Sequence, residues 1–188
     1  AQSLFRLRKW DEALVSYQEL VKDEPTDLFG VNRLAEIHLA SNHLDEAKTT
    51  YMKLAELYTS TNQYHEAIRA LRDLARATPK DKEVHTRLLD LTQEVGDKQA
   101  QAAEHLILSQ ITLEEGRLTE AQGHAEVASV LDPENNEIRR WIYAVKRRIA
   151  ENAGTVQLES SEFSGAKAQP AHGTGRNHLN TDPPEAKD

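Results

Sequence analysis

Three stretches of this chain repeat one pattern at a constant interval. They read WDEALVSYQELVKDEP, YHEAIRALRDLARATP and LTEAQGHAEVASVLDP, and the evenly spaced alanines and prolines that they share are Ala13, Ala67, Ala121, Pro25, Pro79 and Pro133. The residues four and seven places after each alanine lie on the same helical face as that alanine. Alanine lets a neighbouring helix approach closely, and proline ends the helix or opens the next one. Such a period predicts a stack of repeated helical units.

A second pattern, L-A-x-[IL]-[HY], begins at Leu34 and again at Leu54, each time ahead of a [DH]-E-A segment. A helix, a short polar turn and a second helix that closes on proline resembles the tetratricopeptide repeat, a helix-turn-helix unit of about 34 residues. The resemblance covers residues 1 to about 150. It implies an all-α fold, a right-handed solenoid built of helix hairpins.

Residues 45–58 fit this pattern twice, as the second helix of one repeat and as the first helix of the next. The larger unit would then hold three helices, and it would run from Pro25 to Pro79 and again from Pro79 to Pro133. In a two-layered solenoid an odd helix count places equivalent helices in opposite layers. We therefore expect a three-layered, armadillo-like unit, or a superhelix that departs from the usual repeat geometry. The alternative is two ordinary repeats whose similarity is coincidental.

The sequence divides into a repeat domain, residues 1–153, and a tail, residues 154–188. Residues 136–150 are predicted to form a helix that caps the stack, with one apolar face made of Ile138, Trp141, Ile142, Val145 and Ile149. The tail has no periodicity and few apolar residues, so we expect it to be disordered. Residues 1–25 align with 55–79, which is expected of the C-terminal part of a longer repeat array.

Charge and composition argue against several classes of protein. The chain has 23 Lys and Arg against 31 Asp and Glu, a formal net charge of -8, which disfavours nucleic acid as a partner. No apolar run approaches the roughly 18 residues of a membrane-spanning helix, so we expect no membrane insertion. The chain has no cysteine, and we expect a cytoplasmic protein without disulfides.

Residues with catalytic or metal-binding potential form no motif. The eight histidines include no HExxH or similar ligand pair, so we expect no bound metal. The carboxylates recur at turn and helix-face positions, which favours a solvated face over acid–base catalysis. The GTG at 173–175 has no strand before it to make a phosphate loop. The sequence therefore predicts neither a cofactor nor an enzyme. The Arg-rich segment around Trp141 could contact lipid or RNA, but the position of Trp141 on the apolar stripe favours core packing.

The resemblance also indicates where a partner would bind, because the first helix of each repeat usually lines a concave groove in this family. Aligned with that pattern, the exposed positions of these helices are Asn32, Glu36, Thr86 and Asp90. If the middle helix of the three-helix unit lines the groove instead, the corresponding residues are Glu56 and Gln110. The acidic residues among them favour a basic or mixed peptide, helical or extended, over a C-terminal carboxylate.

The leading functional hypothesis is a non-catalytic scaffold that binds a peptide or protein surface in the solenoid groove. One alternative is an accessory tetratricopeptide repeat region of an enzyme whose catalytic domain precedes residue 1. Another is a chaperone for secreted or assembling subunits, which the family also includes. The oligomeric state is not predicted by the sequence.

Overall fold

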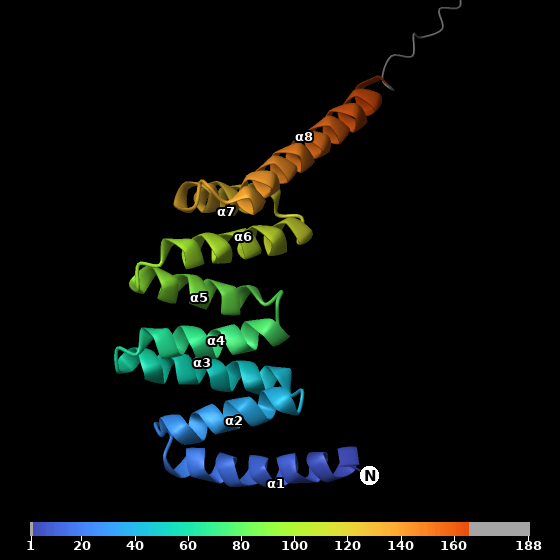
Figure 1. Ribbon diagram of the computed structural model, residues 1–188. Coiled ribbons are helices and arrows are strands. Elements are labelled where there is room, and N and C mark those ends of the chain that lie inside the picture. Colours follow the sequence, from blue (N-terminus) through green and yellow to red (C-terminus); the bar gives the residue numbers. More distant parts are fainter. Residues whose placement is uncertain (1, 166–188) are drawn as a thin grey trace, which may run out of the picture. The chain divides into compact units, whose positions relative to one another are not determined.

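The computed structural model describes residues 2–165 and the side chains of residues 9–153. Within that part of the chain it contains eight helices and no strand: α1 (Gln2–Asp23), α2 (Leu28–Ala40), α3 (Leu44–Ser60), α4 (Tyr64–Ala77), α5 (Lys82–Glu94), α6 (Lys98–Glu114), α7 (Leu118–Leu131) and α8 (Asn136–Gly165). Figure 1 shows α1 to α7 stacked in chain order, each running back along the helix before it. The expected all-α helical-repeat solenoid is confirmed.

The helix bounds repeat with the period that separates Pro25 from Pro79. Shifting α2, α3 and α4 by one such period gives the bounds of α5, α6 and α7, and shifting the start of α5 gives the start of α8. The buried positions of α2 and α5 repeat in the same way. In α2 they are Gly30, Val31, Leu34, Ala35, Ile37 and His38, and in α5 they are Val84, His85, Leu88, Leu89, Leu91 and Thr92. The unit of this solenoid is therefore three helices: α2 to α4 form the first unit and α5 to α7 the second.

The turns between the helices follow the same period. Asp27, Asp81 and Asn135 cap α2, α5 and α8, and each side chain accepts hydrogen bonds of 2.8 to 3.4 Å from backbone N–H groups two and three residues on. These bonds satisfy N–H groups that have no partner within the helix. Each cap stands two residues after one of the repeated prolines, so proline and cap together fix where every third helix begins.

The remaining turns end in a left-handed residue, which closes the helix C-terminus. Gly96 and Gly116 follow α5 and α6 with φ of 71° and 77°. Asn42 and Asn62 take the equivalent places after α2 and α3 with φ of 61° and 59°. Asparagine tolerates this conformation better than other residues with a side chain, which explains why it replaces glycine here.

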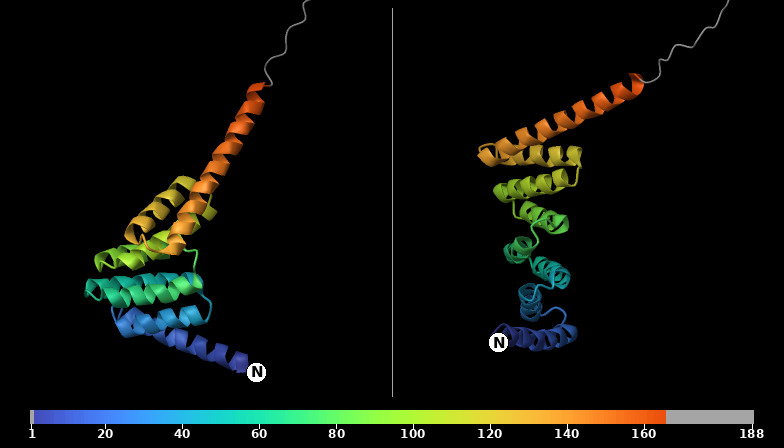
Figure 2. Two further views of the ribbon diagram at one scale, coloured as in Figure 1. Left: turned by 45° about the horizontal axis from the view of Figure 1, so that its top comes forward. Right: turned by 90° about the vertical axis from the view of Figure 1, so that its right-hand side faces the viewer.

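Contacts between alternate helices define the first of two layers. Lys48 on α3 forms ion pairs of 2.8 and 2.7 Å with Asp81 and Glu83 at the start of α5. Lys82 on α5 forms a 2.5 Å ion pair with Glu120 on α7. The helices α3, α5 and α7 therefore lie side by side, and the view along the helices in Figure 2 shows successive helices alternating between two sides of the stack.

The second layer consists of the intervening helices. The indole Nε1 of Trp141 on α8 donates a 2.8 Å hydrogen bond to Oγ of Ser109 on α6, and Ile138 packs against Leu106. Equivalent helices such as α3 and α6 thus fall in opposite layers, and the expected three-layered unit is wrong. Equivalent helices also run in opposite directions (Figure 1), so successive units differ by an exchange of layers together with a reversal of helix direction. Each helix keeps equivalent neighbours under that operation, which resolves the difficulty raised by an odd helix count.

The C-terminal helix is longer than its apolar stripe. Ile138 and Val145 are buried, and Trp141, Ile142 and Ile149 pack against α6 and α7, so the stripe meets the stack as predicted. The compact repeat unit ends at Ile149, and α8 continues to Gly165 as part of a second unit. Residues 154–165, predicted as the start of the tail, are helical; residues 166–188 lie outside the described part of the chain.

Candidate functional site

The two layers divide the six residues predicted to contact a partner. On the layer of α3, α5 and α7 lie Glu56, Thr86 and Asp90. On the layer of α2, α4, α6 and α8 lie Asn32, Glu36 and Gln110. Each residue of the first unit has its equivalent in the opposite layer of the second unit, so a single groove cannot contain all six.

The three residues on the second layer have neighbours within the chain. The carboxylate of Glu36 accepts hydrogen bonds from Arg33 at 2.7 Å and from Asn32 at 3.1 Å, so its charge is largely compensated. Gln110 is half-buried beside a hollow between α6 and α8, whose other lining residues are Glu137, Arg140, Trp141 and Ala144. These residues do not form one continuous surface with a common charge.

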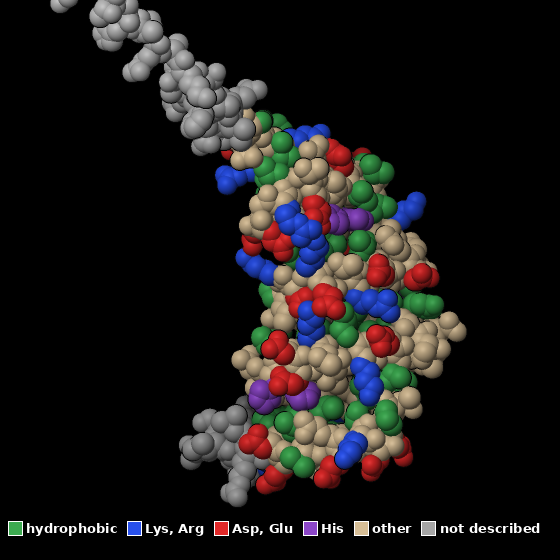
Figure 3. Space-filling model, turned by 180° about the vertical axis from the view of Figure 1, so that it is seen from behind, with side chains coloured by type: hydrophobic (Ala, Val, Ile, Leu, Met, Phe, Trp, Pro, Cys, Tyr) green, Lys and Arg blue, Asp and Glu red, His purple; other side chains and the backbone are tan. Residues whose placement is uncertain are grey.

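The layer of α3, α5 and α7 presents acidic side chains to solvent. Its exposed acids are Asp45, Glu46, Glu56, Glu83, Asp90, Glu94 and Glu126, whereas the cations of these three helices, Lys48, Lys53, Lys82 and Arg87, are half-buried. Among the described residues Glu56 forms no ion pair, and Arg87 stands 3.9 Å from Asp90. Charged side chains gather in a row along the stack on the side opposite to the view of Figure 1 (Figure 3). We call this surface the acidic face.

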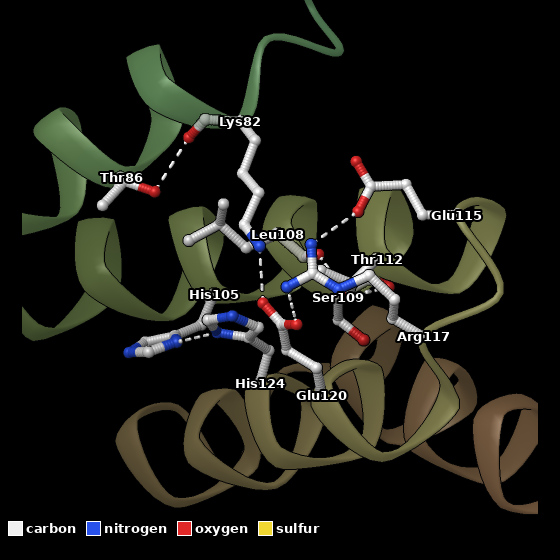
Figure 4. Close-up of polar contacts among 10 residues, drawn as sticks. All are labelled: Lys82, Thr86, His105, Leu108, Ser109, Thr112, Glu115, Arg117, Glu120 and His124. Atoms are coloured by element: carbon white, nitrogen blue, oxygen red, sulfur yellow. Dashed lines mark hydrogen bonds and ion pairs between the residues drawn. The ribbon is translucent and has the colours of Figure 1, made fainter.

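A group of paired polar side chains lies at the junction of α5, α6 and α7 (Figure 4). The polar cluster consists of Lys82, His105, Glu115, Arg117, Glu120 and His124. Glu120 accepts hydrogen bonds from both Lys82 and Arg117, and Arg117 also contacts Glu115 at 3.0 Å. The hydrogen bond from Lys82 is the main reason why the pKa of the Glu120 carboxyl is lowered. The predicted residue Thr86 joins this region through a 2.8 Å hydrogen bond to the backbone carbonyl of Lys82.

Two histidines of the polar cluster share a proton. Nδ1 of His105 lies 2.9 Å from Nδ1 of His124, so one ring donates to the other and at least one imidazole is neutral. Burial lowers the pKa of His105, and the adjacent His124 lowers it further. Burial also lowers the pKa of His124; the charge of Glu120 opposes that shift, while Lys82 and Arg117 add to it. The uncharged form of both imidazole rings is therefore favoured.

This pair predicts a pH-dependent stability. Because the folded-state pKa values lie below the usual 6.5, the unfolded chain binds more protons, and the free energy of unfolding falls as pH drops below about 6.5 through the folded pKa values. Chemical denaturation between about pH 8 and about pH 5 measures this slope. The control is the double variant His105→Tyr, His124→Ala, which reproduces Tyr51 and Ala70 of the first unit. Its slope should be shallower; equal slopes would contradict the role of the pair.

Sequence analysis missed the polar cluster because it compared the units for what they share. At the positions of Lys82, His105 and His124 the first unit has Leu28, Tyr51 and Ala70. Polar residues that replace apolar ones within an otherwise regular repeat depart from what packing requires, and such departures are typical of functional positions. Aligning the two units and comparing where they differ would have found them.

A buried pair beneath the acidic face departs from the repeat in the same way. Nδ1 of His85 lies 2.8 Å from Oε2 of Glu104, and its Nε2 lies 3.1 Å from the carbonyl oxygen of Pro79. Both side chains are less than a tenth exposed. The pair joins α5, α6 and the turn that precedes α5.

No group of three or more His, Cys, Asp or Glu side chains in the described part of the chain could hold a metal ion. None of the described helices is long and apolar enough to cross a membrane.

Comparison with known proteins identifies the class. A tetratricopeptide repeat model matches residues 48–91, and a second tetratricopeptide repeat model matches residues 1–27. With the helical stack, these matches support a tetratricopeptide repeat protein. Proteins of this family are interaction scaffolds with protein or peptide partners and are generally non-catalytic. No curated protein matches the sequence.

Several solved structures are similar to this chain. TTC0263, a thermophilic tetratricopeptide repeat protein of Thermus thermophilus, shares 20% identity over 76% of this chain and 93% of its own, with a TM-score of 0.27. The MamA protein shares 12% identity over 81% and 90%, with a TM-score of 0.37. YrrB, described as having an unusual peptide-binding site, shares 13% identity over 77% and 88%, with a TM-score of 0.26.

Proposed function

We propose that this protein is a scaffold whose acidic face binds a basic segment of a partner protein. The observation that carries the proposal is the separation of charge between the layers. On α3, α5 and α7 all carboxylates except that of Glu120 are exposed and the cations are half-buried, whereas α4 in the other layer exposes three arginines, Arg69, Arg72 and Arg76, beside one exposed acid, Glu66. A surface of one sign attracts a partner of the opposite sign and disfavours others.

The extent of the family match supports the same face. The matched range, residues 48–91, begins in α3, includes α4 and ends in α5. On this basis we take α3 as the first helix of a repeat and α5 as the first helix of the next. Since first helices usually line the groove in this family, we propose the layer of α3, α5 and α7 as the groove layer, with Glu56, Thr86 and Asp90 as its candidate contacts.

The chemistry of the face suits lysine and arginine side chains. Glu56 lies on α3 and Asp90 on the neighbouring α5, so one peptide that crosses both helices could reach both carboxylates. Exposed carboxylates keep their hydration until a partner binds, and their attraction is screened by salt. We expect fast, salt-sensitive association in which the charges set orientation and specificity.

The test compares charge reversal on the two layers. A fluorescein-labelled peptide of alternating lysine and alanine is titrated with wild type, with Glu56→Lys, Asp90→Lys and with the matched control Glu36→Lys, Glu66→Lys on the opposite layer. We expect the double variant to bind about tenfold more weakly or worse at low salt, and the control to bind like wild type. Equal weakening by both variants would mean that only net charge matters and would reject the acidic face as the binding surface.

A further inference from the structure

The outer side of α7 is apolar although it faces solvent. Val127 is 42% exposed and Val130 is 79% exposed, and with Gly123 they lie at helical spacing on the side of α7 opposite its buried alanines. A helix with apolar residues on both sides is normally covered on both sides. We call Gly123, Val127 and Val130 the α7 stripe.

The repeat itself does not require this stripe. At the equivalent positions of α4 stand Arg69, Asp73 and Arg76, which are ordinary solvent-facing charges. Packing within the chain does not require Gly123 either, because a Cβ built there meets no atom within 4 Å. Glycine weakens a helix interior, and its usual compensation is the close approach of another backbone. Within the described residues, nothing approaches it.

We propose that the α7 stripe is the docking site for an amphipathic helix of a partner protein, with cationic side chains beside its apolar stripe. This inference rests on the proposed function, because α7 belongs to the same layer as the acidic face. The apolar residues of the partner helix would pack over Gly123, Val127 and Val130. Its cations would meet the exposed carboxylate of Glu126, which lies beside the stripe on α7. The proposal thus specifies the basic partner as a helix rather than an extended strand.

Both the spacing and the surroundings favour a helix. The stripe from Gly123 to Val130 extends roughly 10 Å along α7, which matches about two turns of a second helix laid against it. Glu126 borders the stripe on one side, and His124 and Glu120 of the polar cluster border it toward α5. An apolar centre with a polar, acidic rim suits the apolar stripe and the flanking cations of an amphipathic basic helix.

The first unit supplies the variant that tests the stripe. Gly123→Arg, Val127→Asp, Val130→Arg gives α7 the residues that α4 already carries at these positions, so the fold tolerates them. The probes are two labelled peptides of lysine and leucine with equal composition: one amphipathic as a helix, and one with the leucines scrambled. We expect wild type to prefer the amphipathic peptide by at least tenfold, and the triple variant to lose that preference. An unchanged preference would overturn the proposal.

A second substitution tests the glycine separately. Gly123→Ala should raise the melting temperature, because alanine favours the helix, while weakening the amphipathic peptide severalfold, because its methyl group keeps the two backbones apart. A variant that is more stable and binds equally well would overturn the close-approach argument.

The same titrations distinguish the helix-docking proposal from the proposal that the acidic face binds a basic segment. If Glu56→Lys, Asp90→Lys weakens both peptides while the triple variant changes neither, the acidic face stands and the helix site is overturned. If the double variant changes neither peptide, the acidic face itself is rejected. Sedimentation of wild type and of the triple variant tests whether a second copy of this chain covers the stripe. If wild type is a dimer and the triple variant is not, the stripe is a contact between two copies, and the proposal of a partner helix is overturned.

Discussion

Substituting His85 by valine will destabilise the protein by about 3 to 5 kcal/mol, because it leaves the buried carboxylate of Glu104 without its partner. The two side chains lie 2.8 Å apart between α5 and α6, and each is less than a tenth exposed. Valine itself fits a site of this kind, since Val31 occupies the equivalent position in the first unit. The expected loss therefore arises from the unpaired carboxylate rather than from misfitting volume. Urea denaturation of the two proteins near neutral pH measures it.

The first unit again supplies the control. The double variant His85→Val, Glu104→Thr installs the residues found at Val31 and Thr50, where no ion pair exists within the described chain. Replacing both members of a buried pair is often neutral, so the double variant should recover most of the stability that His85→Val loses. If the single variant loses less than about 1 kcal/mol, or if the double variant loses as much as the single one, the pairing of His85 with Glu104 does not stabilise the fold.

This contrast shows how the two units have diverged. At two interior positions the first unit has Val31 and Tyr51, whereas the second unit has His85 and His105. Polar side chains in such places are costly unless they are hydrogen-bonded, and here both histidines have partners. The second unit therefore has a hydrogen-bonded polar junction beside the α7 stripe in place of the packing found in the first unit. A chain selected only for stacking would not need that junction.

The helices themselves were readable from the sequence. The start and end of α7, the left-handed Gly96 and the apolar stripe of α8 follow from periodicity, turn chemistry and proline position, which are local properties. The end of α8 was not readable in this way. Its apolar stripe stops at Ile149, but the helix continues to Gly165.

The grouping of the site residues could not be predicted from the sequence, because it depends on which layer each helix joins. Sequence equivalence suggested that Asn32 and Thr86, or Glu36 and Asp90, face the same way. With three helices to a unit and two layers to the stack, equivalence instead places them on opposite sides. Which layer a helix joins depends on the odd number of helices in each unit of the stack. A single repeat does not show that number.

Substituting Leu71 by alanine should cost about 2 to 5 kcal/mol, because it opens a cavity where three helices meet. Leu71 has no exposed surface and lies in the apolar cluster that α2, α3, α4 and α5 form together, next to Leu54 and Leu74. Its equivalent in α7 is Ala125, which is also fully buried. The sequence of α7 thus shows that alanine is compatible with the helix at this position, so a loss of stability must come from the lost packing of the first unit.

A matched substitution on the α7 stripe separates packing from helix propensity. Val130→Ala removes apolar atoms from a side chain that is 79% exposed and should change the free energy of unfolding by no more than about 0.5 kcal/mol. Denaturation of both variants under one condition gives the comparison. Similar small changes for Leu71→Ala and Val130→Ala would show that the stack repacks around the missing leucine. A large loss for Leu71→Ala alone would show that the packing of Leu71, rather than helix propensity, stabilises the first unit.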